Sequence, residues 1–178
     1  MSLDNVLDFI ANNLQYSYLL ILLFAFAESL VVVGSILSSA ILFSICVFLY
    51  NNNLLDLYSI VPLAMIGAHA GDVISFVLGK RFGPLVLETK FFKKRESIIE
   101  RGNNFIDRFG QLTVVLGRFI PAMRAIVPFL IGMTGMEFMK FYRASILAIS
   151  VWGFGLIILT TGLSLSLIHI SEPTRRLS

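Results

Sequence analysis

Residues 117–136 read GRFIPAMRAIVPFLIGMTGM. The stretch is apolar enough to enter a bilayer, yet it contains two arginines, two prolines and three glycines. Each proline removes a backbone hydrogen-bond donor and each glycine weakens a helix, so we do not expect one plain spanning helix here. Irregular backbone survives at membrane depth only where protein or a water-filled cavity surrounds it. The stretch therefore predicts a re-entrant hairpin that lines a polar cavity, with Pro121, Pro128, Gly132 and Gly135 as the residues that form it.

The composition of the whole chain places it in a membrane. Of its 178 residues, 57% are hydrophobic and 14% are charged, which is more apolar than ordinary soluble domains. We therefore expect an all-α membrane protein. Eight Lys or Arg and four Asp or Glu lie between Lys80 and Arg108. By the positive-inside rule, residues 80–110 should form a cytoplasmic loop. Since no nucleic-acid recognition motif accompanies this basic block, we expect no nucleic-acid partner.

The hydrophobic pattern predicts the order of the elements. Residues 1–15 have the spacing of an amphipathic helix at the interface. The apolar run 16–50 is longer than the roughly 20 residues that one span needs, so it must hold a second element. We expect spanning helices at residues 17–33, 57–78 and 141–161, a partly helical loop at 91–109, and broken elements at 34–50 and 112–136.

The early broken element reads GSILSSAILFSICVFLY, and Ser38 and Ser39 are where we expect its backbone to turn. If residues 80–110 are cytoplasmic, the early hairpin and the late hairpin enter from opposite faces of the membrane. Two opposed re-entrant hairpins are the layout of an inverted repeat, which places a binding site near the midplane.

Arg118 and Arg124 are permanent cations within the apolar late element. A guanidinium group offers five donors in a planar fork that suits phosphate or carboxylate. Two of them on broken backbone predict a binding site for an anionic head group inside the bilayer. The alternatives are that these side chains snorkel to the cytoplasmic interface, or that they pair with acids only for folding.

Glu28 and Asp72 are acidic residues within the first two predicted spans. An ionised carboxylate in hydrocarbon is costly, so each should be protonated or should face a partner or water. For Glu28 we favour a titrating group or a partner for a buried arginine over a protonated carboxyl bonded to a neighbouring helix. Asp72 equally fits a position near a membrane boundary or a helix bend.

His69 and Asp72 stand three residues apart and share a helix face. A metal site needs more ligands than these two, and Glu28 is the one plausible third, so we expect no metal. The chain contains no Walker loop, no GxSxG and no HExxH. We therefore expect neither a cofactor nor an enzymatic activity.

These motifs resemble those of the DedA family, which shares the VTT domain with eukaryotic lipid scramblases. GRFIPAMR is similar to the family's G-R-F-x-P-x-x-R segment, in which Arg118 and Arg124 match two essential arginines. Residues 71–83, GDVISFVLGKRFG, are similar to a second family motif, and Glu28 falls on the family's acidic residue. A second acid of many members is replaced here by Ala40. The resemblance identifies residues 16–162 as the membrane domain.

The resemblance implies a multi-pass protein of the bacterial inner membrane that moves lipids such as undecaprenyl phosphate. Its partners would be membrane lipids and protons, with the protons carried by Glu28 and Asp72. Two other readings remain open from the residues. One is a proton-coupled exchanger of small cations or drugs, with Glu28 and Asp72 as the substrate site. The other is a non-transporting assembly factor whose buried charges serve folding.

The end of the chain calls for separate treatment. Residues 165–175, LSLIHISEPTR, resemble the translation of a transposase adapter. We expect residues 164–178 to be a non-native tail that replaces the last helix of the family, and we assign no function to them.

Overall fold

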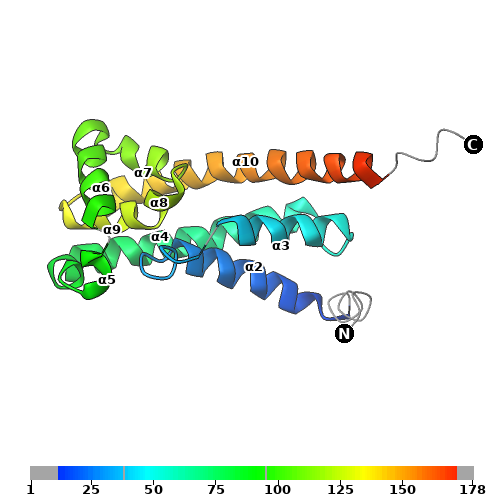
Figure 1. Ribbon diagram of the computed structural model, residues 1–178, viewed down its shortest axis with the longest axis horizontal. Helices are drawn as coiled ribbons and strands as arrows, with labels where there is room; N and C mark the ends of the chain where they lie inside the picture. The colour runs from blue at the N-terminus through cyan, green and yellow to red at the C-terminus, as the bar shows by residue number, and fades with distance from the viewer. Residues whose placement is uncertain (1–11, 38, 95, 172–178) are drawn as a thin grey trace, which may run out of the picture.

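The computed structural model describes residues 12–37, 39–94 and 96–171, and every regular element in these ranges is an α-helix. The all-α class predicted from the sequence is therefore confirmed. The predicted interfacial helix at 1–15 and the end of the predicted tail at 172–178 fall mainly or wholly outside the described residues. The helices are α2 (Leu14–Ser29), α3 (Ser39–Asn51), α4 (Leu57–Leu87), α5 (Lys90–Lys93), α6 (Glu96–Phe109), α7 (Leu112–Gly117), α8 (Pro121–Arg124), α9 (Ile126–Met133) and α10 (Phe138–Ser171) (Figure 1).

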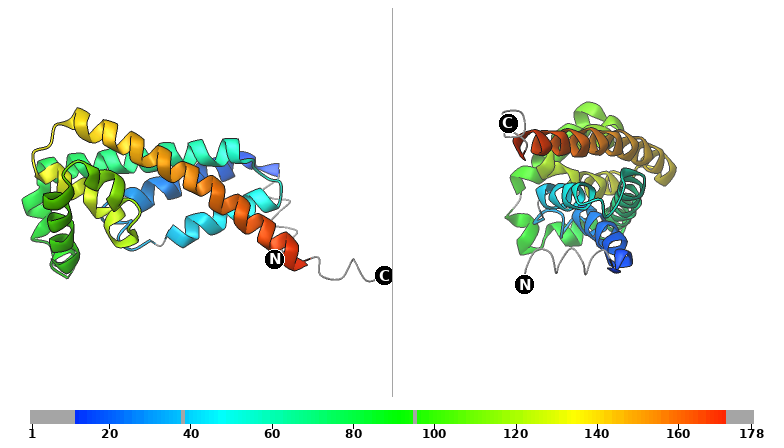
Figure 2. Two further views of the ribbon diagram at one scale, coloured as in Figure 1. Left: turned by 90° about the horizontal axis from the view of Figure 1, so that it is seen from above. Right: turned by 90° about the vertical axis from the view of Figure 1, so that its right-hand side faces the viewer.

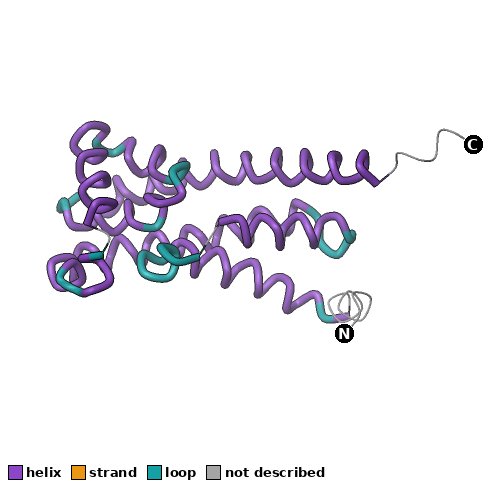
Figure 3. The backbone as a smooth tube through the Cα atoms, viewed as in Figure 1, coloured by secondary structure: helices purple, strands orange, loops and turns teal. Residues whose placement is uncertain are grey.

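The central helix of the bundle is α4, because α2, α9 and α10 all pack against it. Within the described ranges, α4 and α10 are long and apolar enough to cross a membrane, over Leu57–Gly83 and Phe138–Leu163. At ~1.5 Å per residue each segment is about 40 Å long, which exceeds the ~30 Å hydrocarbon core of a bilayer. Figure 3 shows that short turns connect the helices and that α4 and α10 follow the long dimension of the molecule.

The basic segment lies at the end of the bundle where α4 finishes. Here α6 runs across the long direction of α10, as two perpendicular views show (Figure 1, Figure 2). The predicted helical content of residues 91–109 is observed as α5 and α6. The predicted span 57–78 ends too early, however, since α4 continues to Leu87 and carries Lys80 and Arg81 on helix. Packing explains the extension, because Gly79 lies against Phe129 of α9 and Gly83 lies against Met133, the last residue of α9.

The first apolar helix ends earlier than predicted. Instead of reaching Val33, α2 stops at Ser29, and residues 30–37 form the turn that leads to α3. Ser75 of α4 fixes this end: its hydroxyl accepts a hydrogen bond from the Val31 amide at 3.0 Å and donates one to the Ser29 carbonyl at 3.1 Å. The α2 end is therefore set by a contact that is distant in the sequence.

The region predicted to be the early broken element contains an uninterrupted helix. Ser39 is the first residue of α3, and Ser38 lies outside the described residues, so the backbone turns before the predicted pair of serines. Leu42, Cys46 and Leu49 repeat at helical spacing and bury one face of α3 in a core shared with α2, α4 and α10. That one-sided burial accounts for a continuous helix here.

The late element is broken, as its prolines predict. Ile120 is extended (φ −100°, ψ 108°) and Pro121 begins α8, the place where a missing amide costs no helical hydrogen bond. Pro128 sits in the first turn of α9 for the same reason. Gly135 has φ +75° just after α9, a conformation that glycine adopts without strain.

Gly132 acts differently from its prediction as a hairpin-forming residue. It lies inside α9, where an added Cβ would collide with the Phe76 carbonyl of α4. Gly79 of α4 is related in the same way to the Phe129 carbonyl of α9. These two glycines let the helix backbones approach closely, which is how small residues act at helix interfaces in membranes.

Candidate functional site

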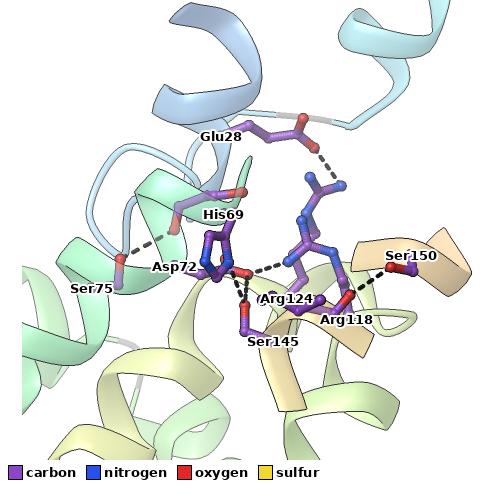
Figure 4. A network of polar contacts seen from close by, with 10 residues as sticks. Glu28, His69, Asp72, Ser75, Arg118, Arg124, Ser145 and Ser150 are labelled. Atoms are coloured by element: carbon purple, nitrogen blue, oxygen red, sulfur yellow. Dashed lines mark hydrogen bonds and ion pairs between the residues drawn. The ribbon is translucent and has the colours of Figure 1, made fainter. Parts of the chain in front are cut away.

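Four charged side chains from separate segments converge inside the bundle. We call Glu28, Asp72, Arg118 and Arg124 the charge cluster. Glu28 is in the last turn of α2, Asp72 is in the middle of α4, Arg118 follows α7, and Arg124 ends α8. Their exposed fractions are 2%, 1%, 5% and 5%, so none of them reaches an open surface. Figure 4 shows both carboxylates directed toward the arginines.

The charges of the cluster are paired one to one. Arg118 Nη1 donates a hydrogen bond to Asp72 Oδ2, and Arg124 Nη1 lies 2.9 Å from Glu28 Oε1. The sequence alone left Asp72 near a membrane boundary, near a helix bend or within the apolar span; in the structure it is 1% exposed and lies in the middle of α4. Removing one member of a buried ion pair leaves an uncompensated charge, so each pair should hold together the segments that it joins.

A single tryptophan covers both cations. The Trp152 ring of α10 has its centroid 5.4 Å from the Arg118 guanidinium carbon and 5.2 Å from that of Arg124. At such distances the negative face of an indole attracts a cation. Sequence reasoning assigned Trp152 no role, and its one signal was that it is the only tryptophan of the chain.

Ser145 links Asp72 to His69. The Ser145 hydroxyl donates to Asp72 Oδ2 at 3.3 Å, and His69 Nδ1 lies 3.1 Å from the same hydroxyl oxygen. The His69 ring meets Tyr142 edge to face, with centroids 4.8 Å apart. The shared face of His69 and Asp72 was predictable from their spacing, whereas Ser145, one of several serines on α10, gives no signal in the sequence. Among the described residues no three His, Cys, Asp or Glu side chains gather as metal ligands would.

The arginines also line a cavity of about 230 Å³ between α3, α10 and the α7–α8 segment, which we call the site cavity. Trp152 forms part of its wall, and neither carboxylate of the charge cluster does. The rest of the lining is apolar and consists of Phe43, Phe119, Gly155, Leu156 and Leu159. The cluster as a whole is electrically balanced, but the side that faces this cavity is cationic.

The charge cluster and the helices around it lie within a known domain. The sequence profile of the VTT domain matches residues 16–161. The chain belongs to the VTT-domain family. The relatives confirm the resemblance to the DedA family, since they include Protein DedA of Escherichia coli (strain K12). That protein is 27% identical over 150 residues, which cover 82% of this chain and 68% of Protein DedA.

Two other relatives of this VTT-domain protein are named as membrane proteins. "Uncharacterized membrane protein BU139" of Buchnera aphidicola subsp. Acyrthosiphon pisum (strain APS) is 31% identical over 145 residues, covering 82% of this chain and 57% of the relative. "Inner membrane protein YabI" of Escherichia coli (strain K12) is 31% identical over 144 residues, covering 81% of this chain and 57% of the relative. The chain thus spans little more than half of these two relatives. No solved structure gives a significant match. The family, the names of these bacterial relatives and the two membrane-length helices together support a membrane association of this helical chain.

Proposed function

We propose that this VTT-domain protein moves lipids with an anionic head group, a polyprenyl phosphate or a phospholipid, between the two leaflets of the bacterial inner membrane. The observation that carries the proposal is the cationic wall of the site cavity, whose lining residues include Arg118 and Arg124 and neither carboxylate. Charged residues buried in membrane segments commonly mark the path of a substrate or ion. No step of this function requires bond chemistry, so we propose a carrier without enzymatic activity.

Arg118 has donors to spare for a phosphate. Its Nη1 is used by Asp72, while Nε and Nη2 have no hydrogen-bond partner among the described residues although they are buried. A phosphate oxygen accepts strong, charge-assisted hydrogen bonds from such a fork. The head group would thus find its ligands at the arginines while its hydrocarbon remains in an apolar environment.

Glu28 and Asp72 would act as exchangeable counter-ions. When no lipid is bound, they neutralise the arginines; when a phosphate binds, the carboxylates compete with it for the same donors. Glu28 Oε2 and Asp72 Oδ1 are buried without a hydrogen-bond partner in the described part of the chain, so each carboxyl group has an oxygen available to a proton. Uptake of a proton by one of them would favour lipid binding and its loss would favour release, which couples transport to protons.

The proposed membrane arrangement follows the two helix-turn segments. We propose that residues 34–50, which contain α3, and residues 112–136, which contain α7 to α9, enter the membrane as opposed re-entrant elements, with the charge cluster where they approach. Residues 80–110 would then face the cytoplasm. A substrate site between two such elements is known from transporters built as inverted repeats.

The pairing itself favours one competing function. Because each arginine has a carboxylate partner, the cluster could serve folding alone in a non-transporting assembly factor. A small-cation exchanger has less support, since it would require an acidic cavity wall and the observed wall is formed by arginines.

The test separates charge from folding. The double variant Glu28→Gln with Arg124→Gln removes one ion pair without leaving an unpaired charge. The purified variant should fold in vesicles, yet it should no longer accelerate the movement of a labelled polyprenyl phosphate between leaflets. Arg143→Gln, which removes an exposed arginine of α10, is the matched control and should be fully active. Full transport by the double variant would refute the role of this ion pair in transport, whereas no acceleration by the unsubstituted protein would refute the proposal and favour the assembly factor.

A further inference from the structure

A second cavity continues the site cavity along α3 and α10. It measures about 710 Å³ and is lined by Val47 and Phe48 of α3 and by Leu163 of α10. Phe43 and Leu159, one from each helix, line both cavities. The two spaces therefore adjoin each other between the same two helices, and together we call them the chain groove.

The dimensions of the chain groove match one leaflet of a membrane. On α10 its lining extends from Trp152 to Leu163, and on α3 from Ala40 to Asn51. Each stretch covers about 16 Å at ~1.5 Å per residue. That length is about half of the ~30 Å hydrocarbon core of a bilayer. The arginines line one end of the groove, and Asn51, the last residue of α3, lines the other.

We propose that the chain groove holds the hydrocarbon chain of the lipid whose anionic head is bound by Arg118 and Arg124. This inference rests on the proposed function and adds a second binding site to it. The occupant must combine an anionic end with a long apolar body, because guanidinium groups line one end of the groove and mainly apolar side chains line the rest. A lipid phosphate has this form.

A comparison within the same molecule shows what distinguishes this groove. α3 also borders a further apolar cavity of about 520 Å³, which it forms with α2 and which shares Ser44 and Phe48 with the chain groove. No charged residue lines that cavity, so an ordinary membrane lipid chain would satisfy it. Of these two spaces, only the chain groove is lined by residues of the charge cluster.

The role of the groove is steric. A lipid chain that leaves the bilayer for an apolar groove exchanges one apolar environment for another, and it gains little from the hydrophobic effect. The groove instead provides the space that lets a head group reach the arginines while its chain is attached. Filling this space should therefore block lipid phosphates and spare free phosphate.

Two glycines of α10 allow a matched test. Gly155 lines the site cavity, and Gly162 lies two turns further along the helix, outside both cavities. A Cβ added at either residue meets no atom within 4 Å. Gly155→Leu would thus place its Cβ without a clash and add the rest of its side chain at the wall of the site cavity. Gly162→Leu makes the same exchange of glycine for a better helix former at an exposed residue that lines neither cavity.

The experiment measures phosphate binding through Trp152, the only tryptophan of the chain, with the protein in phosphatidylcholine nanodiscs. The probes are inorganic phosphate and hexadecyl phosphate. Gly155→Leu should raise the Kd of hexadecyl phosphate by about tenfold, equivalent to about 1.4 kcal/mol, and should leave that of inorganic phosphate within about twofold. Gly162→Leu should leave both Kd values unchanged.

The other outcomes have separate meanings. Equal losses for the two probes, or no loss for hexadecyl phosphate, would overturn the chain groove and leave the anion site standing. A change of oligomeric mass in Gly155→Leu alone would also overturn it, because the groove would then hold a helix of a second copy. If neither probe alters the fluorescence of the unsubstituted protein, the proposed function itself fails and the groove fails with it.

Discussion

Ser75→Ala should release the end of α2 that carries Glu28. The Ser75 side chain is fully buried in α4, and its hydroxyl bonds both the Val31 amide and the Ser29 carbonyl. Alanine removes the hydroxyl without adding volume, so two backbone groups of the turn lose their partner. Since Glu28 directly precedes Ser29, the substitution should also loosen the carboxylate that faces Arg124.

The magnitude follows from the two hydrogen bonds. Hydrogen bonds between helices in a membrane contribute about 0.6 kcal/mol each on average and at most about 1.7 kcal/mol. In water-soluble proteins a buried group left unsatisfied costs about 1–3 kcal/mol. The membrane values apply here, because the backbone around Val31 can form a helix in the unfolded, membrane-inserted state, and its N–H and C=O groups are then hydrogen-bonded. We therefore expect a loss of about 1–3 kcal/mol in the free energy of unfolding.

The assay is reversible unfolding in mixed micelles, together with hydrogen exchange of the Val31 amide. Ser150→Ala is the control: its hydroxyl bonds the Ile146 carbonyl of its own helix at 2.9 Å and is exposed, so its loss should change stability by less than about 0.5 kcal/mol. The expected result is a lower unfolding midpoint and faster Val31 exchange in Ser75→Ala alone. Equal stability of the two variants, with Val31 still protected, would refute the reasoning.

Two further predictions concern packing around the cluster. Gly79→Ala should destabilise the protein by about 1–3 kcal/mol because the new methyl group collides with the Phe129 carbonyl. The control, Gly162→Ala, should be neutral or stabilising by up to about 1 kcal/mol. Unfolding midpoints that fall equally in the two variants would contradict this prediction. Trp152→Leu should lower the thermal unfolding temperature more than Trp152→Phe, because phenylalanine keeps an aromatic face for Arg118 and Arg124 and leucine does not. Equal unfolding temperatures for the two variants would show that the ring contacts contribute nothing to stability.

The convergence of the charge cluster could be anticipated because a buried charge requires compensation. Arg118 and Arg124 lie in a segment too apolar to leave the membrane, and Glu28 lies in another such segment. An isolated charge is costly in the membrane, so contact between these opposite charges has a lower free energy than most other arrangements. The break of the late element was predictable for a similar reason, since Pro121 and Pro128 restrict the backbone locally.

Features that depend on distant contacts could not be predicted in this way. The α2 end is set by Ser75, which follows Ser29 by 46 residues, and nothing near Ser29 signals it. Gly132 looked like a residue of a turn because glycine weakens helices, but its missing Cβ serves close packing against Phe76. Local propensity and tertiary packing use the same residue types, and the sequence alone does not separate the two uses.

The backbone that carries each charge explains why the cavity faces cations. Asp72 is held in the middle of the long helix α4, and Glu28 is fixed by the Ser75 contact one residue beyond it. Arg118 instead lies in the break between the short helices α7 and α8, and Arg124 is the last residue of α8. A short helix with few backbone hydrogen bonds opens at lower cost than a long packed one. A carrier of this kind would therefore keep its acids fixed and let its arginines move with the head group, which is the opposite of what a cation exchanger requires.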